Sequence, residues 1–585
     1  MAPDLHSENR IAGVLVPLFS LRRDDDLGIG DVTALAEFID WASSAGVGFI
    51  QLLPVNETGP DNSPYNAISA VALDPLTLDC SPGKLIDLAE DTFWEVLGRQ
   101  NMNHLRRGGV KYGEVRPLKL DLLWRAYVRF LEGHYQRGTD RDLEFHLFCE
   151  EERSWLGDYC LFRMLMDMEG GSQLWTEWPE EYRSVGKARE YVNRLLDLEP
   201  DRAERQLVFY AYVQWVARDQ WRAVRSHAEA KGVKLMGDIP FGVSTYSADV
   251  FANPGIFDLD WYGGAPPERL FKDDPFVQKW GQNWGIPLYR WDVMEANGFA
   301  WWRQRVRKVA EVFSLFRVDH ALGFYRIYAF PWNPARNAEF APLDEDEAAT
   351  RCGGRLPGFK PCPDDTTEHC LSNRADGEKY LAMVNEAAGP AAVIAEDLGM
   401  VPEYVRPSLE SLRIAGMKVP QWEWDDYHRI TPGSSYHETS FATYATHDHS
   451  PMKAQWQEQR ALAYGAPEGS AERNEAWRFL NGLCSFAGIN AFSGPDGSFP
   501  EYTDAVREGL LRGLALSNSR YAGIMITDLL GLTDRVNVPG VLAGENWVWR
   551  LDMTVKDLTR NPHWTAIATG LRNMLHETGR CAAGK

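Results

Sequence analysis

Short apolar segments of strand length alternate with longer amphipathic segments along most of this 585-residue chain. The apolar segments predict eight strands, at 13–19, 48–53, 233–238, 315–319, 392–396, 417–422, 441–446 and 524–527. Helices are predicted between them at 31–45, 204–231, 299–313, 377–388, 402–414 and 471–486. Such alternation is typical of parallel strands joined by helices. Since eight of these units close a (β/α)₈ barrel, we expect an α/β TIM barrel.

The chain is much longer than a barrel requires. A simple barrel takes about 250 residues, so more than half of this sequence must be insertions between strands. The largest, at 61–202, is rich in aromatic and helix-forming residues and predicts a helical subdomain. A smaller insertion is expected at 320–375. Because no repeat, low-complexity tract or Ser/Gly linker separates the parts, we expect one catalytic domain over 1–585.

The charge balance restricts the partners. A formal net charge of -22 opposes nucleic acid and anionic membrane surfaces, because both carry negative charge themselves. No apolar run approaches the roughly 18 residues that would span a bilayer. A neutral substrate fits this negative net charge better than an anionic partner does. The 22 tryptophans suit stacking on sugar rings, although core packing uses the same side chains.

The cysteines indicate the compartment. Eight cysteines occur at low density, without C-x-x-C spacing, which predicts free thiols in a reducing, cytoplasmic environment. The amino-terminal residues lack the pattern of a signal peptide. Cys352, Cys362, His369 and Cys370 crowd one Gly/Pro-rich loop and raise zinc binding as an alternative. Structural zinc ligands usually come as two closely spaced pairs, so we expect no metal and no cofactor.

Four predicted strands end in an acidic residue, namely Asp238, Asp319, Glu396 and Asp448. The carboxyl ends of barrel strands surround the active-site mouth, so these four side chains should converge there. Any one of them alone has an ordinary alternative, because an Asp after a strand is often a helix cap. Their common placement is what indicates a catalytic site.

The surroundings of two of these acids predict different protonation. Arg317 and Asp319 are two residues apart on one strand and lie on the same face. A fixed guanidinium lowers the pKa of a neighbouring carboxyl, which suits a nucleophile. The alternative is that Arg317 and Asp319 form a buried ion pair that only stabilises the barrel. Glu396 follows an apolar run, where burial would raise its pKa and keep it protonated as a general acid.

This pair of carboxyl groups has the composition of a glycosidic site. Retaining cleavage requires two carboxyl groups about 5 to 5.5 Å apart, one attacking the anomeric carbon and one protonating the leaving oxygen. Asp319 and Glu396 match that chemistry in type. Asp448, with His447 beside it, could hold the sugar as positive charge develops, or simply cap the next helix.

Short motifs carry a resemblance that runs nearly from end to end. They are 28–31 GIGD, 51–54 QLLP, 63–65 SPY, 237–240 GDIP, 280–285 WGQNWG, 287–291 PLYRW, 316–320 FRVDH, 395–399 AEDLG, 416–419 GMKV, 446–448 THD and 546–547 NW. In this order they resemble the amylomaltase or disproportionating-enzyme family, glycoside hydrolase family 77 of the α-amylase clan. The resemblance implies a barrel without the clan's C-terminal β-domain. It also implies a 4-α-glucanotransferase that moves α-1,4-glucan segments between donor and acceptor sugars by double displacement.

The resemblance also implies roles for individual residues. By similarity Asp319 is the nucleophile, Glu396 the acid/base and Asp448 the stabilising carboxylate. The sugar at the cleavage point would stack on Tyr65. It would be held by Asp238, Arg317 and His447. Trp284 and Asn546, within two of the motifs, are further candidates for binding substrate.

One more candidate lies in a segment at 260–274, which we expect to be flexible. By position it matches a family loop over the acceptor side of the cleft, and Trp261 and Tyr262 would offer stacking faces. An ordinary Gly/Pro surface turn is the alternative. The sequence departs from the family pattern at Pro60, in HALG at 320–323 and at His449 and Ser450, all beside the acids rather than at them.

Two other functions share these features. An α-1,4-glucan hydrolase would perform the same first step and differ only in its acceptor, which is water. A non-catalytic glucan-binding protein would keep the aromatics but usually lose a catalytic acid, whereas all three positions here are acidic. Products formed from maltotriose separate transfer from hydrolysis.

Overall fold

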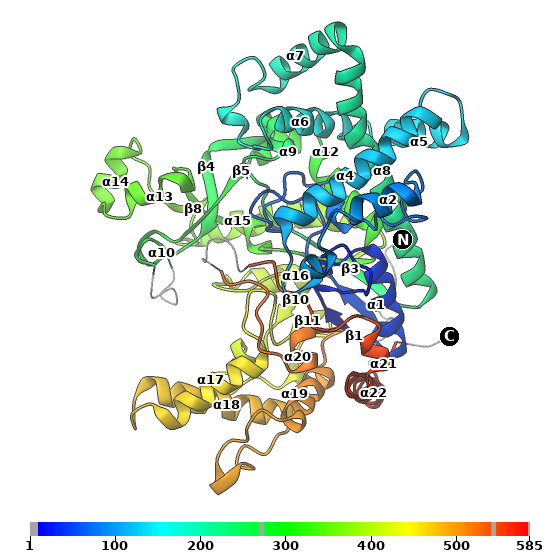
Figure 1. Cartoon of the computed structure of the whole chain (residues 1–585). Coiled ribbons are helices and arrows are strands. Elements are labelled where there is room, and N and C mark those ends of the chain that lie inside the picture. Colours follow the sequence, from blue (N-terminus) through cyan, green and yellow to red (C-terminus); the bar gives the residue numbers. More distant parts are fainter. Residues whose placement is uncertain (1–9, 268–273, 540–545, 583–585) are drawn as a thin grey trace.

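The computed structural model describes residues 10–267, 274–539 and 546–582. Its centre is a closed barrel of parallel strands, in the order β1-β12-β11-β10-β9-β6-β3-β2 (Figure 1). The strands are β1 (Ile11–Leu15), β2 (Phe49–Gln51), β3 (Lys234–Ile239), β6 (Leu315–Val318), β9 (Ala392–Ala395), β10 (Ala415–Lys418), β11 (Ser440–Thr443) and β12 (Tyr521–Met525). The predicted barrel is therefore confirmed. Its interior is filled by large apolar side chains, among them Phe49, Met236, Leu315 and Phe441.

Each predicted strand overlaps an observed one, but three are displaced. The strand expected at 13–19 lies at Ile11–Leu15, and Pro17 caps a 3₁₀ turn after it. The strand expected at 417–422 ends at Lys418, because Pro420 lacks a backbone N–H and opens a 3₁₀ turn. The strand expected at 524–527 begins earlier, at Tyr521, and helix α20 (Ile526–Leu530) follows it directly. Apolar runs at these places do not distinguish the last strand residues from the first helical turn.

The predicted helices are present and cover the outside of the barrel. They are α1 (Val32–Ser44), α8 (Pro200–Ala230), α12 (Ala300–Val312), α15 (Thr367–Ala388), α16 (Val405–Ser411) and α18 (Ala471–Ala487). Helix α15 begins ten residues earlier than expected, at Thr367 instead of 377. The Thr366 side chain accepts the His369 N–H there and caps the helix.

The stretch 61–202 is helical mainly from residue 90 onward. The helices there are α2 (Glu90–Leu97), α3 (Met102–Arg106), α4 (Tyr112–Gly133), α5 (Asp140–Glu151), α6 (Leu156–Met168) and α7 (Val185–Leu198). Together with α8 they enclose an apolar cluster of their own, which includes Tyr127, Phe130 and Phe162. In Figure 1 these blue and cyan helices rise above the barrel.

A second sheet of four strands, in the order β5-β4-β7-β8, stands beside the barrel. It consists of β4 (Phe257–Ala265), β5 (Gln282–Tyr289), β7 (Ile327–Phe330) and β8 (Gly358–Lys360). The insertion expected at 320–375 thus shares a sheet with residues between β3 and β6. The flexible segment expected at 260–274 is wrong for its first part, since 260–265 belong to β4 and pair with β5 and β7. Residues 268–273 of that segment lie outside the described residues.

The remaining helices lie between β3 and β6, in the stretch 320–375 and in the carboxyl-terminal third. They are α9 (Ala248–Ala252), α10 (Pro275–Trp280), α11 (Trp291–Ala296), α13 (Asn337–Phe340), α14 (Glu345–Arg351), α17 (Met452–Gly465), α19 (Asp504–Leu516), α21 (Asp557–Arg560) and α22 (Pro562–Glu577). After β12 the described residues form helices and loops and no strand, as expected for a chain without a C-terminal β-domain. Within the described ranges, no helix combines the length and apolarity needed to cross a bilayer.

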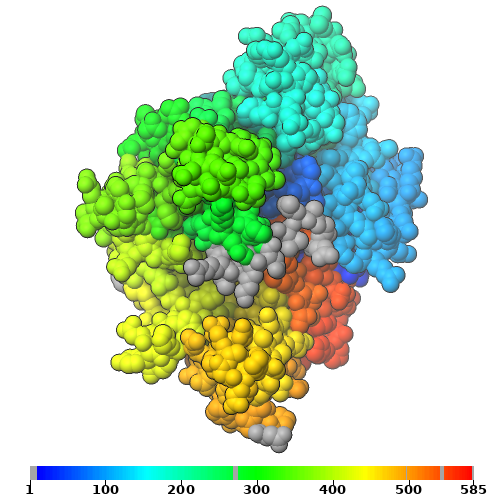
Figure 2. Space-filling view, turned by 90° about the vertical axis from the view of Figure 1, so that its left-hand side faces the viewer, coloured from blue at the N-terminus to red at the C-terminus, as the bar shows by residue number. Residues whose placement is uncertain are grey.

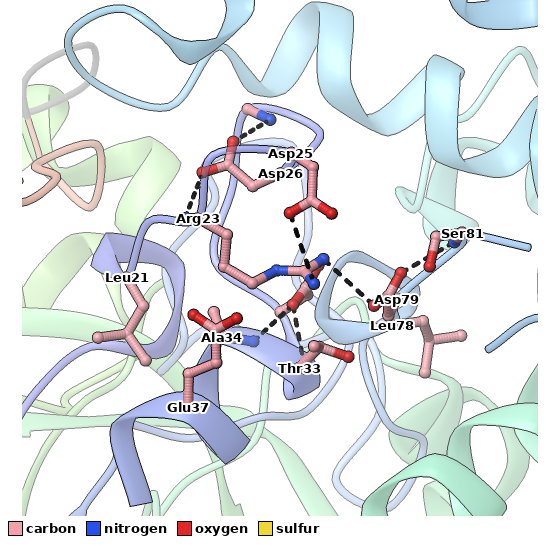
Figure 3. A network of polar contacts seen from close by, with 12 residues as sticks. Leu21, Arg23, Asp25, Asp26, Thr33, Ala34, Glu37, Leu78, Asp79 and Ser81 are labelled. Atoms are coloured by element: carbon pink, nitrogen blue, oxygen red, sulfur yellow. Dashed lines mark hydrogen bonds and ion pairs between the residues drawn. The ribbon is translucent and has the colours of Figure 1, made fainter. Parts of the chain in front are cut away.

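A buried ion-pair network joins the loop after β1 to the helical insertion (Figure 3). The guanidinium of Arg23 lies 3.1 Å from Asp31, which caps α1, and 3.2 Å from Asp79. On the same loop, Asp26 accepts a hydrogen bond from Arg550 at 2.6 Å, and both side chains are fully buried. The network therefore ties the first barrel loop to segments far away in the sequence.

Candidate active site

A cavity of about 1000 Å³ opens where the barrel strands end. It is lined from several loops, and its wall includes Tyr65, Trp284, Arg317, Asp319, His320, Glu396, Trp422, His447, Asp448, His449, Asn537 and Trp547. In Figure 2 the cyan residues of the helical insertion, the green residues that include the second sheet and the yellow to orange residues that include α17 and α18 lie around the centre of one face. Most of the site residues predicted from sequence are thus brought together.

Asp319 and Glu396 follow neighbouring strands at matching positions. In the β6–β9 register Val318 faces Ala395, so the next residues on each strand are the two acids. The ladder continues past them, since Glu396 N–H donates to Val318 at 3.0 Å and Ala321 N–H donates to the Glu396 carbonyl at 3.0 Å. Neighbouring strands lie about 4.8 Å apart, so the backbones of the two acids are adjacent.

Arg317 joins Asp319, which lines the cavity, to Asp238, which is not among the lining residues. Its Nη2 lies 2.7 Å from Asp319 Oδ1, and its Nη1 lies 2.7 Å from Asp238 Oδ2. The Tyr65 hydroxyl donates to the same Asp238 oxygen at 2.7 Å. The expected interaction of Arg317 with Asp319 is therefore present. Arg317 and Asp238 are almost completely buried, whereas the Asp319 side chain is 28% exposed and accessible from the cavity.

Burial raises the pKa values of two acids in this site by different amounts. It raises the pKa of Glu396 to about 8, with Asp319 adding to the rise and Arg317 opposing it. Glu396 Oε2 accepts the His320 backbone N–H at 2.7 Å, which leaves its other oxygen to carry a proton. Burial also raises the pKa of Asp238 to about 6, against the attraction of Arg317. A protonated Glu396 at neutral pH agrees with the environment expected from sequence.

Asp448 is held in its ionised form. Burial alone would raise its pKa, but the neighbouring His447 imidazole and a hydrogen bond from Asn537 together hold the pKa well below its usual value. His447 Nε2 lies 3.2 Å from Asp448 Oδ2, and Asn537 Nδ2 donates to Oδ1 at 2.6 Å. The Arg535 guanidinium donates to the Asp448 carbonyl at 2.6 Å and fixes the backbone.

An aromatic group forms the wall beside these acids. Tyr65 stacks on His447 with ring centroids 4.8 Å apart and planes 14° apart. The Trp547 ring is tilted against both, at 5.9 Å from Tyr65 and 5.7 Å from His447. Aromatic faces of this kind can pack against apolar parts of a ligand, while the nearby carboxylates accept hydrogen bonds from its polar groups.

Three expected substrate-binding residues are not among the residues of the cavity wall. Asp238 is the first, although it contacts Tyr65 and Arg317, which are in the wall. Trp261 is on β4 and outside the cavity wall, and its ring lies under Lys360, with Nζ 4.0 Å from the centroid. Asn546 also lies outside the wall, where it accepts from Val538 N–H at 2.9 Å and donates to Val538 O at 3.0 Å. Its neighbour Trp547 faces the cavity instead. Trp284 lies in the wall as expected, 40% exposed.

Several residues of the site were missed from sequence. Asn537, Arg535 and Trp422 belong to loops without a motif, so no local pattern pointed to them. Trp547 could have been found, because it is the second residue of the NW motif already noted at 546–547. Whether Asn546 or Trp547 faces the cavity depends on the direction of the backbone, which the motif does not reveal.

His449, one of the departures from the family pattern, faces the cavity. Its Nδ1 accepts the Thr446 backbone N–H at 3.1 Å, so a neutral ring carries its proton on Nε2. Burial lowers the pKa of His449 to about 4, which keeps the ring neutral near pH 7. The ring lies edge to face against Trp422, with centroids 4.8 Å apart.

The four residues expected in one loop, Cys352, Cys362, His369 and Cys370, are not all in a loop, because His369 and Cys370 belong to α15 and Cys352 caps the end of α14. Cys352 is buried among apolar side chains that include Phe340, and Cys362 donates to Asn373 at 3.2 Å. His369 pairs with Asp365 at 2.5 Å. In the part of the chain that the structure describes, no three His, Cys, Asp or Glu side chains are placed to hold a metal ion.

A closed parallel barrel with carboxylates and aromatic rings at its mouth defines a carbohydrate-active TIM-barrel enzyme. The sequence profile of the 4-alpha-glucanotransferases, glycoside hydrolase family 77, matches residues 16–555. The chain belongs to this family, and it is a glycosyl-transferring enzyme.

Individual relatives agree with this assignment. The 4-alpha-glucanotransferase of Chlamydia muridarum is 27% identical over 568 residues, which cover 96% of this chain and 94% of the relative. The 4-alpha-glucanotransferase of Thermus thermophilus is 32% identical over 397 residues, 67% of this chain and 68% of the relative. A solved amylomaltase from Streptococcus agalactiae, in complex with acarbose, shares the fold with a TM-score of 0.73 at 22% identity, covering 98% of this chain and 100% of that one.

Proposed function

We propose that this 4-α-glucanotransferase works by a retaining double displacement in which Asp319 is the nucleophile and Glu396 the acid/base. The observation that supports it is the register of β6 and β9, which sets the two acids side by side at the cavity. Two acids that follow adjacent positions of neighbouring strands suit retention, which requires carboxyl groups about 5 to 5.5 Å apart, whereas inverting enzymes need roughly 6.5 to 9.5 Å for an intervening water.

In the first step an Asp319 oxygen attacks the anomeric carbon of the donor glucan. The bond from that carbon to the glycosidic oxygen breaks, and Glu396 gives its proton to the departing oxygen. In the second step Glu396, now ionised, takes the proton of an acceptor hydroxyl. That oxygen attacks the same carbon, the ester to Asp319 breaks, and both acids return to their starting forms.

The neighbouring groups would hold the reacting sugar. Ionised Asp448 would contact its hydroxyls as positive charge develops on the ring, and Tyr65 would stack against its apolar face. Asp238 Oδ1 is buried and has no hydrogen-bond partner among the described residues, which suits an acceptor reserved for a sugar hydroxyl. Arg317 keeps Asp238 and Asp319 oriented, because it contacts both.

Transfer requires that a sugar hydroxyl reach the ester before water does. Trp284 and Trp422 line the cavity with 40% and 47% of their surfaces exposed, and they offer stacking faces for further glucose units. Binding an acceptor there would raise its local concentration and displace water. We therefore favour maltooligosaccharides or amylose as both donor and acceptor.

Incubation with maltotriose alone tests the proposal. Transfer produces glucose and a ladder of longer oligomers, which chromatography resolves, whereas short products without a ladder would identify a hydrolase. The Asp319→Asn variant should form neither set of products. Unchanged products from this variant would refute the nucleophile and leave the reaction class standing.

We also propose the domain organisation expected from sequence, a single catalytic barrel over 1–585 with a helical subdomain at 61–202 and a smaller insertion at 320–375. The separate apolar cluster of the helices supports the first insertion. A cytoplasmic location is proposed as well, and all eight cysteines, each within the described residues, are free thiols.

A further inference from the structure

Trp547 has an unusual backbone conformation for a large side chain. Its φ is +64°, in the left-handed region that non-glycine residues rarely adopt. The side chain is 7% exposed and packs beside Leu53, Ala445 and Met525 at the top of the barrel. Strained residues of this kind persist only where their surroundings hold them, and they gather at functional sites.

The strained residue shapes the cavity. Trp547 is part of the cavity wall, and its ring is tilted against both members of the Tyr65–His447 stack. Tyr65 donates to Asp238, and His447 contacts Asp448. A displacement of the indole would therefore be transmitted to Asp448 in the cavity wall and, through Tyr65, to Asp238.

The bonds that hold this backbone come partly from the helical insertion. Trp547 N–H donates to Val536 O at 3.1 Å. Its carbonyl accepts the hydroxyl of Tyr112 at 2.8 Å, and Tyr112 is the first residue of α4. Next to it, Val110 N–H donates to Val548 O at 2.8 Å. The insertion thus contacts the strained residue on the side away from the cavity.

Both ends of this junction are anchored. The buried pair of Arg550 and Asp26 fixes the chain three residues beyond Trp547 to the loop after β1, which is the loop drawn in Figure 3. The insertion approaches so closely that a Cβ on Gly109 would lie 2.8 Å from the Val548 carbonyl oxygen. Little room remains for either segment to adjust, so the Tyr112 bond bears directly on the conformation of Trp547.

We propose that Tyr112 is a positioning residue for the transfer reaction. Its hydroxyl holds the Trp547 carbonyl in the left-handed conformation and so keeps the indole against Tyr65 and His447. The helical insertion then contributes to the catalytic geometry without touching the substrate. This inference rests on the proposed roles of Tyr65 and His447, although the reaction class does not depend on it.

The test compares two tyrosines of the same helix. Tyr112→Phe removes the bond to Trp547 O, whereas Tyr127→Phe, the matched control, removes an equivalent bond of 2.9 Å to the Arg205 carbonyl, far from the cavity. We expect Tyr112→Phe to lower kcat for maltotriose about tenfold with a smaller change in KM, since a misplaced active-site wall slows the reacting step. Tyr127→Phe should leave kcat unchanged, and melting temperatures are measured for both.

A double-mutant cycle identifies the route. Trp547→Gly keeps a backbone that tolerates positive φ while removing the ring. If Tyr112 acts through the indole, adding Tyr112→Phe to Trp547→Gly should cause no further loss of kcat. Gly109→Ala places a methyl group against the Val548 carbonyl from the insertion side. It should therefore lower kcat although Tyr112 itself is unchanged.

Equal kcat values for Tyr112→Phe and Tyr127→Phe would overturn the inference, as would additive losses in the cycle. If the melting temperature of Tyr112→Phe is much lower than that of Tyr127→Phe, the test relies on Gly109→Ala alone. An unchanged kcat for Gly109→Ala would then overturn the inference. Failure of the proposed reaction is separate, because it would already show in the wild-type products from maltotriose.

Discussion

The phenol of Tyr65 stacks on the imidazole of His447, with centroids 4.8 Å apart, while its hydroxyl donates to Asp238 at 2.7 Å. One side chain therefore serves as an aromatic face and as a hydrogen-bond donor. These two uses can be separated by substitution, since phenylalanine keeps the ring and loses only the hydroxyl.

We expect Tyr65→Phe to lower kcat about tenfold, as for the loss of one hydrogen bond to a carboxylate. Tyr65→Ala should lose roughly a hundredfold, because the stack with His447 disappears as well. Initial rates of glucose release from maltotriose measure both. Equal losses in the two variants would contradict a separate contribution from the ring.

The raised pKa of Glu396 predicts the alkaline limb of the activity profile. Burial raises this pKa to about 8, so the acid form that protonates the leaving oxygen is lost as the pH rises through 8. Glu396→Gln should lower kcat/KM by about 10³-fold and abolish that limb. A glycosyl fluoride donor needs no proton on its leaving group, so it should restore formation of the intermediate in this variant. Continued inactivity with the fluoride would argue against the acid role.

Asn537 offers a test of the carboxylate that it contacts. Asn537→Ala removes the 2.6 Å bond to Asp448 Oδ1 and should lower kcat about tenfold or more. Asn385→Ala is the matched control, because its amide donates to the Leu412 carbonyl at 3.2 Å, outside the cavity wall. Identical kinetics of the two variants would show that Asp448 is oriented without Asn537.

The network around Arg23 predicts a large effect on stability. Arg23→Met leaves Asp31 and Asp79 buried without their cation and should cost about 3 to 5 kcal/mol in the free energy of unfolding. Arg99→Met removes an exposed pair with Glu95 and should cost less than about 1 kcal/mol. Urea unfolding of both variants measures the difference. A loss below about 1 kcal/mol for Arg23→Met would contradict the structural importance of the network.

Asp528 predicts a pH dependence of stability. Burial raises its pKa from 3.8 to about 7, although Met452 N–H donates to it at 2.7 Å. Between these values the folded state binds more protons than the unfolded state, so this group lowers stability as the pH rises from 4 to 7. Asp528→Asn keeps the acceptor and should be more stable than wild type at pH 8, by an amount on the order of 2 kcal/mol. The same difference between variant and wild type at pH 4 and pH 8 would exclude this titration.

Motifs with strand-end acids were sufficient to predict from sequence which acids meet at the mouth of the barrel. Asp319, Glu396 and Asp448 all line the cavity, because the carboxyl ends of parallel strands meet at one face of a barrel whatever the insertions do. Trp261 shows where this reasoning stops. The sequence around Trp261 resembles a flexible turn, but the segment forms strand β4, which pairs with β5 and β7. Such pairing joins residues far apart in the chain, so the local sequence does not predict it.

The sequence by itself determined the barrel, its family and the acids at its mouth, since these follow from local periodicity and short motifs. Only the tertiary structure decided which polar and aromatic residues surround those acids. Asn537 reaches Asp448 across 89 positions, and the Tyr112 hydroxyl reaches Trp547 across 435. No local pattern encodes such contacts, because they depend on how the insertions pack against the barrel.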